Sequence, residues 1–402
     1  MQKKSLELYF HIPFCVQKCL YCDFLSAPAD EIMKHKYMEA LLTETVGGAL
    51  QYQDYIVDSI FVGGGTPSTV SVEDTEKLLA TVREHYCLAE DAEVTMEVNP
   101  GTVDLEKLSQ YRNAGVNRLS IGMQSANDEE LQKIGRIHTW EQFENAFRDA
   151  RTAGFDNINV DIMSALPGQT AESYEETLQK VLNLPNPPEH ISAYSLIVEE
   201  GTPFGTLFEQ GELELPNEEE DRYMYHRTKE LLKVAGYHRY EISNYSREGC
   251  ECRHNVGYWT RKNYVGFGIG AASLLENVRF QNSDDIRKYI VEPCGCRENI
   301  QELSLQEQME EMLFLGLRLT VGVDEEQFER TFGKSLEEVY GVVIARNMED
   351  GLLQWMEVTG KEGVGTPDVT LEEDGNRRYF RRLVLTERGL DVSNYVMAQF
   401  LL

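Results

Sequence analysis

The first half of the chain alternates short β-rich runs with longer stretches in which apolar residues recur at helical spacing. The short runs predict strands and the longer stretches predict helices. Repeated alternation of this kind is typical of βα units around a parallel sheet. The predicted strands are Leu8–Ile12, Ser59–Val62, Glu93–Val98, Arg118–Gly122, Asn157–Ile162 and Ile191–Leu196, and the helices include Val72–Tyr86, Trp140–Ala153 and Ala171–Leu184, with Asp104 as the N-cap of another.

Six βα units predict an α/β fold built on a parallel TIM-like (β/α)6 barrel, partial or closed. A doubly wound open sheet is the competing fold. In a barrel, functional residues lie at the carboxyl ends of the strands.

The pattern changes near residue 302, so we expect two domains, 1–300 and 301–402. Between the sixth strand and this boundary only a helix over Glu218–Ala235 is clear. The later part predicts a helical, winged-helix-like domain containing a pair of β-like runs separated by a polar, glycine-containing loop. Its helices are expected at Leu305–Leu317, Glu325–Phe332, Leu336–Asp350 and Glu387–Leu402. No basic recognition helix is evident, which favours a structural or partner-docking role over DNA binding.

The charge balance argues against nucleic acid as a partner. The 402 residues include 38 Lys and Arg against 68 Asp and Glu, a net charge of −30. Phosphate backbones are bound by Lys and Arg that displace counterions, so this surface would repel them. The N-terminus resembles no secretory signal, and no apolar run is long enough to cross a bilayer. We therefore expect a soluble, cytoplasmic protein without a transmembrane segment.

Directly after the first predicted strand, the sequence HIPFCVQKCLYCDF places Cys15, Cys19 and Cys22 in a C-x3-C-x2-C loop over residues 15–22. Cytosolic thiols stay reduced, and clustered ones more often bind metal than form disulfides. Three thiolates on a compact loop can hold three irons of a [4Fe–4S] cluster, leaving the fourth iron open. A zinc site completed by a distant ligand is the alternative. Candidates for that ligand are Cys250, Cys252 and His254, or Cys294 and Cys296.

Polar and glycine residues recur where the predicted strands end. GGGTPS at residues 63–68 follows the second strand, and Glu97, Gln124 and Asp161 lie at the ends of later strands. Each alone could be a cap or a turn residue. Together they line the end of a barrel where a ligand binds.

These strings resemble the radical S-adenosylmethionine (SAM) superfamily, which has this cysteine spacing with an aromatic residue before the third Cys. The branch they resemble comprises the oxygen-independent coproporphyrinogen III oxidases and the HemW-type heme chaperones. The similarity covers nearly the whole chain. The strings that carry it are YFHIPFCVQKCLYCDF, FVGGGTPS, EVNPGT, NRLSIGMQS, GRIH, DIMSALPGQT, YEISNYSREGC and LTERGLDVSNYVMAQFL.

The resemblance implies a radical SAM barrel in which SAM chelates the open iron and an electron from the cluster cleaves it to a 5′-deoxyadenosyl radical. It implies a reductant such as flavodoxin or ferredoxin as a partner. Gly64, Gly65 and Thr66 would line the methionine moiety, Glu97 would contact its amino group and Arg136 its carboxylate. Gln124 and Asp161 would hold the ribose, and Tyr9 and Tyr21 would pack near the cluster and adenine.

One departure separates the two subfamilies. The oxidases carry a further Cys two residues after the cluster motif, where this chain has Phe24. This difference favours a heme chaperone, which would bind heme as cargo and deliver it to a client such as a respiratory hemoprotein. A radical SAM oxidoreductase or methyltransferase acting on a porphyrin is the alternative, and the sequence assigns no further catalytic residue.

The string HNVGYW at residues 254–259 resembles a heme-associated motif of the chaperones. His254 is a candidate axial ligand of heme iron, and Tyr258 and Trp259 could pack on a porphyrin face. The alternative is that His254 hydrogen-bonds inside the barrel. Many relatives have a second His in a GIGAGAH-like string, at or near the place of Leu274 here.

Overall fold

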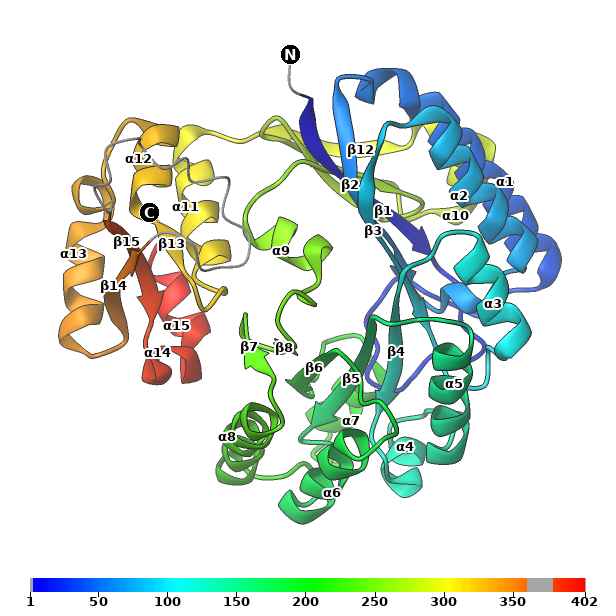
Figure 1. Ribbon diagram of the computed structural model, residues 1–402, viewed down its shortest axis with the longest axis horizontal. Helices are drawn as coiled ribbons and strands as arrows, with labels where there is room; N and C mark the ends of the chain where they lie inside the picture. Colours follow the sequence, from blue (N-terminus) through cyan, green and yellow to red (C-terminus); the bar gives the residue numbers. More distant parts are fainter. Residues whose placement is uncertain (1–2, 360–378, 402) are drawn as a thin grey trace.

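The computed structural model describes residues 3–359 and 379–401, and its central element is a curved sheet (Figure 1). Six strands pair in chain order, each parallel to the one before it. In a doubly wound sheet the strand order changes direction partway across the sheet, which does not happen among these six strands. The prediction of a barrel is therefore confirmed. The strands are β1 (Lys4–Ile12), β2 (Tyr55–Gly64), β3 (Leu88–Val98), β4 (Arg118–Gln124), β5 (Ile158–Ser164) and β6 (His190–Ser195).

The barrel is partial. On one side β1 pairs with β9, and on the other β6 pairs with β8, so β1 and β6 do not meet. Three antiparallel strands continue the sheet beyond β9. The added strands are β7 (His238–Arg239), β8 (Asn244–Ser246), β9 (Tyr264–Phe267), β10 (Ala272–Leu275), β11 (Val278–Asn282) and β12 (Arg297–Glu302).

Helices cover the outer face of the parallel strands (Figure 1). Their starts follow local capping rules: the Asp104 side chain accepts from the Lys107 amide at 2.9 Å, as the sequence predicts. The helices of this part of the chain, apart from α9, are α1 (Glu31–Gly48), α2 (Val72–His85), α3 (Leu105–Asn113), α4 (Asp128–Lys133), α5 (Trp140–Thr152), α6 (Ala171–Leu182), α7 (Pro203–Glu209), α8 (Glu218–Val234) and α10 (Ile286–Val291), with 3₁₀ turns at Ala49–Tyr52, Pro67–Thr69 and Pro293–Gly295. Helix α9 (Arg253–Trp259) differs, because it lies on the concave side of the sheet.

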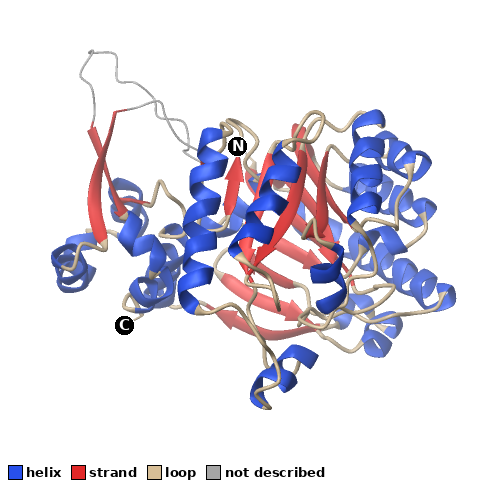
Figure 2. Ribbon diagram, turned by 90° about the horizontal axis from the view of Figure 1, so that it is seen from below, coloured by secondary structure: helices blue, strands red, loops and turns tan. Residues whose placement is uncertain are grey.

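The C-terminal part packs helices against a small sheet of order β13-β15-β14 and has its own group of buried apolar side chains (Figure 2). The predicted polar loop between its β-like runs lies outside the described residues. The single final helix predicted over Glu387–Leu402 is wrong: Val392, at φ −124°, separates two short helices. The elements are α11 (Leu305–Gly316), β13 (Val323–Asp324), α12 (Glu325–Phe332), α13 (Leu336–Glu349), β14 (Leu353–Thr359), β15 (Tyr379–Leu385), α14 (Glu387–Asp391) and α15 (Ser393–Ala398).

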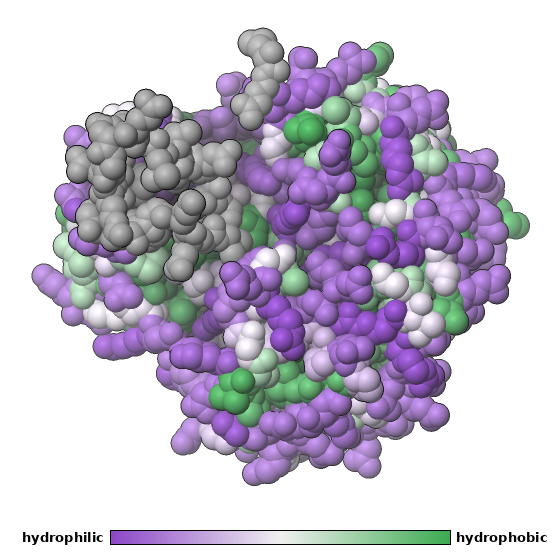
Figure 3. Space-filling view, in the orientation of Figure 1, coloured by the Kyte–Doolittle hydropathy of each residue, from purple (hydrophilic) through white to green (hydrophobic). Residues whose placement is uncertain are grey.

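Hydrophilic residues cover most of the face seen in Figure 3, and apolar residues gather there only in small groups. None of the helices in the described ranges is long and apolar enough to cross a membrane.

Candidate functional site

The three cysteines of the predicted cluster loop lie between β1 and α1. Backbone hydrogen bonds fix this loop: the Cys22 amide donates to the Cys19 carbonyl at 3.3 Å, and the Leu20 amide donates to the Ile134 carbonyl at 3.1 Å. All three thiols are partly exposed, and they line one cavity of about 580 Å³ at the carboxyl ends of the strands. The loop therefore presents its sulfur atoms to the place where a barrel binds its ligand.

The arrangement of these thiols fits a cluster better than a single zinc ion. Within residues 3–359 and 379–401, no three His, Cys, Asp or Glu side chains are grouped closely enough to hold one metal ion. The distant cysteines have other neighbours: Cys252 lies 3.6 Å from Glu93 Oε1, and Cys294 lies 3.7 Å from the Thr43 carbonyl. Thiols spread around one cavity match a multi-iron cluster, which takes each thiolate on a different iron.

Nearly all the residues that the sequence assigned to SAM line the same cavity. The exception is Tyr9, which lies outside its lining and whose hydroxyl is 3.0 Å from His11 Nδ1. The structure brings together residues from the cysteine loop, from four successive strands or the turns that follow them, and from the segment between α4 and α5, which supplies Arg136. Those in the lining are Tyr21, Gly64, Gly65, Thr66, Glu97, Gln124, Arg136 and Asp161.

Gly65 shows why the predicted glycine motif is needed here. A Cβ atom at this position would lie 2.7 Å from the Phe14 carbonyl oxygen and 3.1 Å from Cys15 Sγ. Only glycine lets the end of β2 pass this close to the cysteine loop. Thr66 continues the contact, with its Oγ1 3.5 Å from Cys15 Sγ.

Two carboxyls on partly buried residues, Glu97 and Asp161, give the cavity its electrostatic character. Burial, together with nearby Asp161, raises the pKa of Glu97 to about 8. Burial also raises the pKa of Asp161, whose Oδ1 accepts from Asn159 Nδ2 at 2.8 Å. Two carboxyls that share a desolvated cavity repel each other when both are ionised. A ligand that brings positive charge and hydrogen-bond donors, as SAM does, would relieve this repulsion.

Arg136 links the cluster loop to the strand ends. Its Nη2 donates to Asn99 Oδ1 at 2.9 Å and also to the Gly122 carbonyl, and its Nη1 lies 3.8 Å from Cys19 Sγ. A guanidinium held beside a thiolate can favour the anionic sulfur and still bind a carboxylate.

Asn99 and Tyr194 are among the polar residues of this cavity that sequence reasoning missed. Asn99 donates to Thr66 Oγ1 at 2.8 Å, and the Tyr194 hydroxyl donates to Gln124 Oε1 at 3.1 Å. Both lie at or just after strand ends, so the rule that found Glu97 and Asp161 could have found them.

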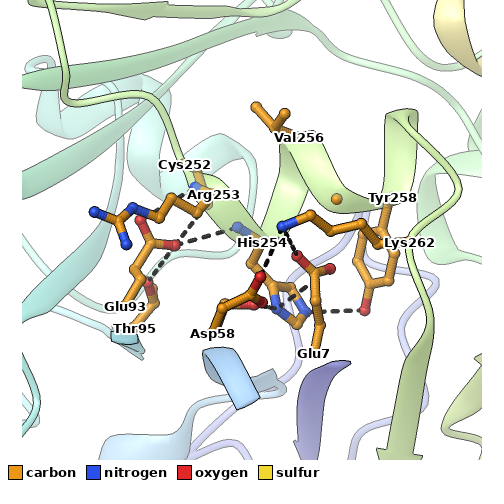
Figure 4. Close-up of polar contacts among 12 residues, drawn as sticks. Glu7, Asp58, Glu93, Thr95, Cys252, Arg253, His254, Val256, Tyr258 and Lys262 are labelled. Atoms are coloured by element: carbon orange, nitrogen blue, oxygen red, sulfur yellow. Dashed lines mark hydrogen bonds and ion pairs between the residues drawn. The ribbon is translucent and has the colours of Figure 1, made fainter. Parts of the chain in front are cut away.

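The HNVGYW string forms α9, which lies over buried acidic side chains (Figure 4). Glu93 accepts from the backbone amides of Arg253 at 3.1 Å and His254 at 3.3 Å, so a carboxylate from β3 caps the start of the helix. Further along α9, Glu7 is fully buried, and burial raises its pKa well above the usual value. Lys262 Nζ lies 3.8 Å from Glu7 Oε1 and 2.9 Å from Asp58 Oδ2.

His254 is 1% exposed and has a partner at each ring nitrogen. Nδ1 lies 2.9 Å from Ser59 Oγ, and Nε2 lies 3.0 Å from the Tyr258 hydroxyl (Figure 4). Burial lowers the pKa of His254 to about 3, so the imidazole is neutral. Of the three predicted heme residues, Tyr258 and Trp259 line a second cavity together with Tyr9 and Leu274, whereas His254 does not.

Comparison with known proteins agrees with this geometry and defines the class. The family model of the Radical SAM superfamily matches residues 9–181, and the model of the HemN C-terminal domain matches residues 303–355. The solved coproporphyrinogen III oxidase HemN of Escherichia coli, described as a radical SAM enzyme, superposes with a TM-score of 0.81. It is 22% identical, and the match covers 100% of this chain and 91% of that one. This is a radical SAM protein fold.

The particular family follows from curated sequences. The heme chaperone HemW of Lactococcus lactis is 36% identical over 100% of this chain and 99% of its own length. The heme chaperone HemW of Bacillus subtilis is 38% identical over 86% of this chain and 92% of its own length. The chain belongs to the HemW family of radical SAM proteins, and this membership implies a [4Fe–4S] cluster and SAM.

Proposed function

We propose that this protein binds heme and delivers it to a client hemoprotein, while holding a SAM-bound [4Fe–4S] cluster. The observation that carries the proposal is Phe24, a 59% exposed residue that lines the cluster cavity. It stands where the similar oxidases have a further Cys, so the loop offers the cluster motif without the additional thiol. Sequence similarity to the heme chaperones HemW of Lactococcus lactis and Bacillus subtilis supports the same conclusion.

In this proposal, each cysteine of the loop binds one iron of the cluster, and the cavity beside it holds SAM. When bound, the cluster supplies the electron that cleaves SAM. The chain orients the ligand: Glu97 accepts from its amino group, Arg136 pairs with its carboxylate, and Asp161 accepts from its ribose hydroxyls. Gly64, Gly65 and Thr66 let the backbone approach the methionine moiety, and Tyr21 and Gln124 close the pocket.

The remaining partners follow from the same chemistry. A reductant such as flavodoxin or ferredoxin would reach the cluster from the side of the cavity where Phe24 is 59% exposed. A cytoplasmic location suits partly exposed thiols that must stay reduced to bind iron.

A second candidate is an enzyme that oxidises or methylates a porphyrin. The observation that favours it is the cavity itself, which is lined by the polar strand-end residues needed to orient SAM. A protein that only stored the cluster would not need these residues.

One experiment separates the two candidates. The protein is reconstituted anaerobically and mixed with SAM, dithionite and either heme or coproporphyrinogen III. A chaperone should bind about one heme per chain, with a Soret band unlike that of free heme, and should form no protoporphyrinogen. Vinyl-group formation at catalytic turnover, measured by mass spectrometry, would identify an oxidase instead. Loss of both activities would overturn heme delivery and porphyrin chemistry together.

We also propose that the chain divides into a barrel domain over residues 1–300 and a winged-helix-like domain over 301–402. Support comes from the separate apolar cluster formed by residues from Met309 to Phe400. Strand β12 ends at Glu302, which puts the change of structure two residues after the proposed boundary.

A further inference from the structure

A second cavity, of about 320 Å³, lies beside α9, with Tyr258 and Trp259 of that helix in its lining. Its walls come from α9, from the start of β9, from the antiparallel strands β10 and β11, and from α11 of the C-terminal part. Aromatic and aliphatic side chains dominate its lining: Tyr258, Trp259, Tyr264, Leu274, Phe314 and Leu315. Such walls, with a few placed polar groups, are typical of a site for a large planar ligand.

Arg279 supplies the charge in this lining, and its electrostatic balance is incomplete. Its Nη2 lies 2.7 Å from Glu311 Oε1, but the other oxygen of this carboxylate, Oε2, pairs with Arg261 Nε at 2.9 Å. Two guanidiniums therefore share the carboxylate of Glu311, so each has only part of that charge as its partner. An anionic group on a ligand would complete this balance.

Unpaired donors in the same wall point to the same kind of ligand. Trp259 Nε1 and Arg279 Nε are buried and have no hydrogen-bond partner within the described part of the chain. A buried donor without an acceptor loses its hydrogen bond to water and gains none in return, which destabilises the protein. A carboxylate that reached these nitrogen atoms on binding would recover that cost.

We propose that this cavity, defined as the α9–α11 pocket, seats a carboxylate-bearing edge of heme, with Arg279 receiving a propionate and the aromatic wall contacting the macrocycle. This inference rests on the proposed heme-binding function and names its site. A volume of about 320 Å³ is near the lower limit of ligand pockets, so the pocket holds one edge of the macrocycle. The opposite edge stays accessible, as transfer to a client requires.

In this site His254 is a positioning residue and not the iron ligand. Both of its ring nitrogens already have partners, and its imidazole is absent from the pocket lining. Its contact with the Tyr258 hydroxyl fixes the phenol ring. That ring meets Tyr264 edge to face, with centroids 4.6 Å apart, and so forms one corner of the pocket.

The test measures binding of heme, metal-free protoporphyrin IX and protoporphyrin IX dimethyl ester to the full-length, anaerobically reconstituted protein. The wild type should bind the free acid more tightly than the ester, because the ester blocks the carboxylates. Arg279→Gln should weaken binding of the free acid by about 10- to 100-fold, the range for a hydrogen bond to a charged group, and remove the preference over the ester. Arg279→Lys keeps the positive charge but loses the two-pronged guanidinium, so its affinity for the free acid should lie between those of the wild type and Arg279→Gln.

Leu274→Trp should fill the pocket and block both porphyrins, while iron content and SAM binding remain as in the wild type. The matched controls are Arg287→Gln, on α10, and Ile300→Trp, at a 67% exposed position on β12. His254→Asn should weaken heme and metal-free protoporphyrin IX by the same factor, because the residue acts through Tyr258.

The outcomes are distinguishable. Wild-type protein that binds no tetrapyrrole would overturn the proposed function, and this site with it. Wild-type binding that Arg279→Gln and Leu274→Trp leave unchanged would overturn only the site. Loss of heme binding in His254→Asn with unchanged protoporphyrin IX binding would make His254 an iron ligand and refute its positioning role.

Discussion

A Cβ atom at residue 257 would lie 1.9 Å from Oε1 of Glu7, so α9 rests directly on a buried carboxyl group of β1. Glycine at this point of HNVGYW is therefore required by a contact between segments 250 residues apart in sequence. The same contact holds Tyr258 and Trp259 at the edge of the α9–α11 pocket.

Gly257→Ala should destabilise the protein by about 1–3 kcal/mol, because overpacking forces α9 or Glu7 to move. Urea denaturation followed by circular dichroism measures the loss. Adding Glu7→Ala should restore part of the stability, giving a coupling energy between the two sites. The control is Gly341→Ala in α13, where a new Cβ meets nothing within 4 Å and alanine should be neutral or stabilising. Equal effects at both glycines would refute the contact.

Replacing Cys15, Cys19 or Cys22 with Ala should prevent cluster formation, because each thiolate would hold a different iron in the proposed arrangement. Anaerobic reconstitution of the wild type should give about four irons and four sulfides per chain, measured by colorimetric assay and by absorbance. Cys87→Ala, at an exposed position away from the loop, should reconstitute normally. A stoichiometric zinc ion in protein from iron-replete cells, without a recoverable cluster, would contradict this assignment.

Asp161→Ala should weaken SAM binding by about 1–3 kcal/mol if the carboxyl accepts buried ribose hydrogen bonds. Equilibrium dialysis under anaerobic conditions measures the affinity, and iron content shows that the cluster is intact. Asp161→Asn keeps one acceptor oxygen and should have an intermediate effect. Unchanged affinity in the alanine variant would remove Asp161 from the site.

Glu44 should make stability depend on pH. It accepts from the Tyr289 hydroxyl at 2.6 Å and from Asn282 Nδ2 at 2.7 Å, and burial raises its pKa from 4.5 to about 7. The fold therefore favours its protonated form. This contribution is complete below pH 4.5 and is lost as pH rises through about 7, for a total of about 3 kcal/mol.

The measurement is urea denaturation from pH 4.5 to 8 on the wild type and Glu44→Gln. Gln cannot ionise, so the variant should lose less stability as pH rises, whatever its absolute stability. Parallel pH profiles for the two proteins would show that Glu44 titrates alike in the folded and unfolded states.

The local elements and the position of the cysteine loop could be predicted from the sequence alone. Helical spacing and N-cap residues such as Asp104 act over a few residues, so they are readable along the chain. The cysteine spacing lies within one loop, and the strand-end residues converge because parallel strands share their carboxyl edge. Of the predicted SAM residues, Tyr9 alone falls outside the lining of that cavity, and it lines the second cavity with Tyr258 and Trp259 instead.

Tertiary structure decided the rest. Whether the sheet closed depended on β8 and β9, short strands whose pairing with β6 and β1 is set by packing over long sequence separations. The final helix is divided at Val392. Nearby, Gly389 packs so closely on the backbone that a Cβ atom on it would lie 2.0 Å from the Leu352 carbonyl oxygen. His254 could have been an exposed ligand or an internal hydrogen-bonding group. In this structure the packing of α9 brings the His254 ring to Ser59 of β2 and near Glu7 of β1, partners about 200 residues or more earlier in the chain, which no local pattern could reveal.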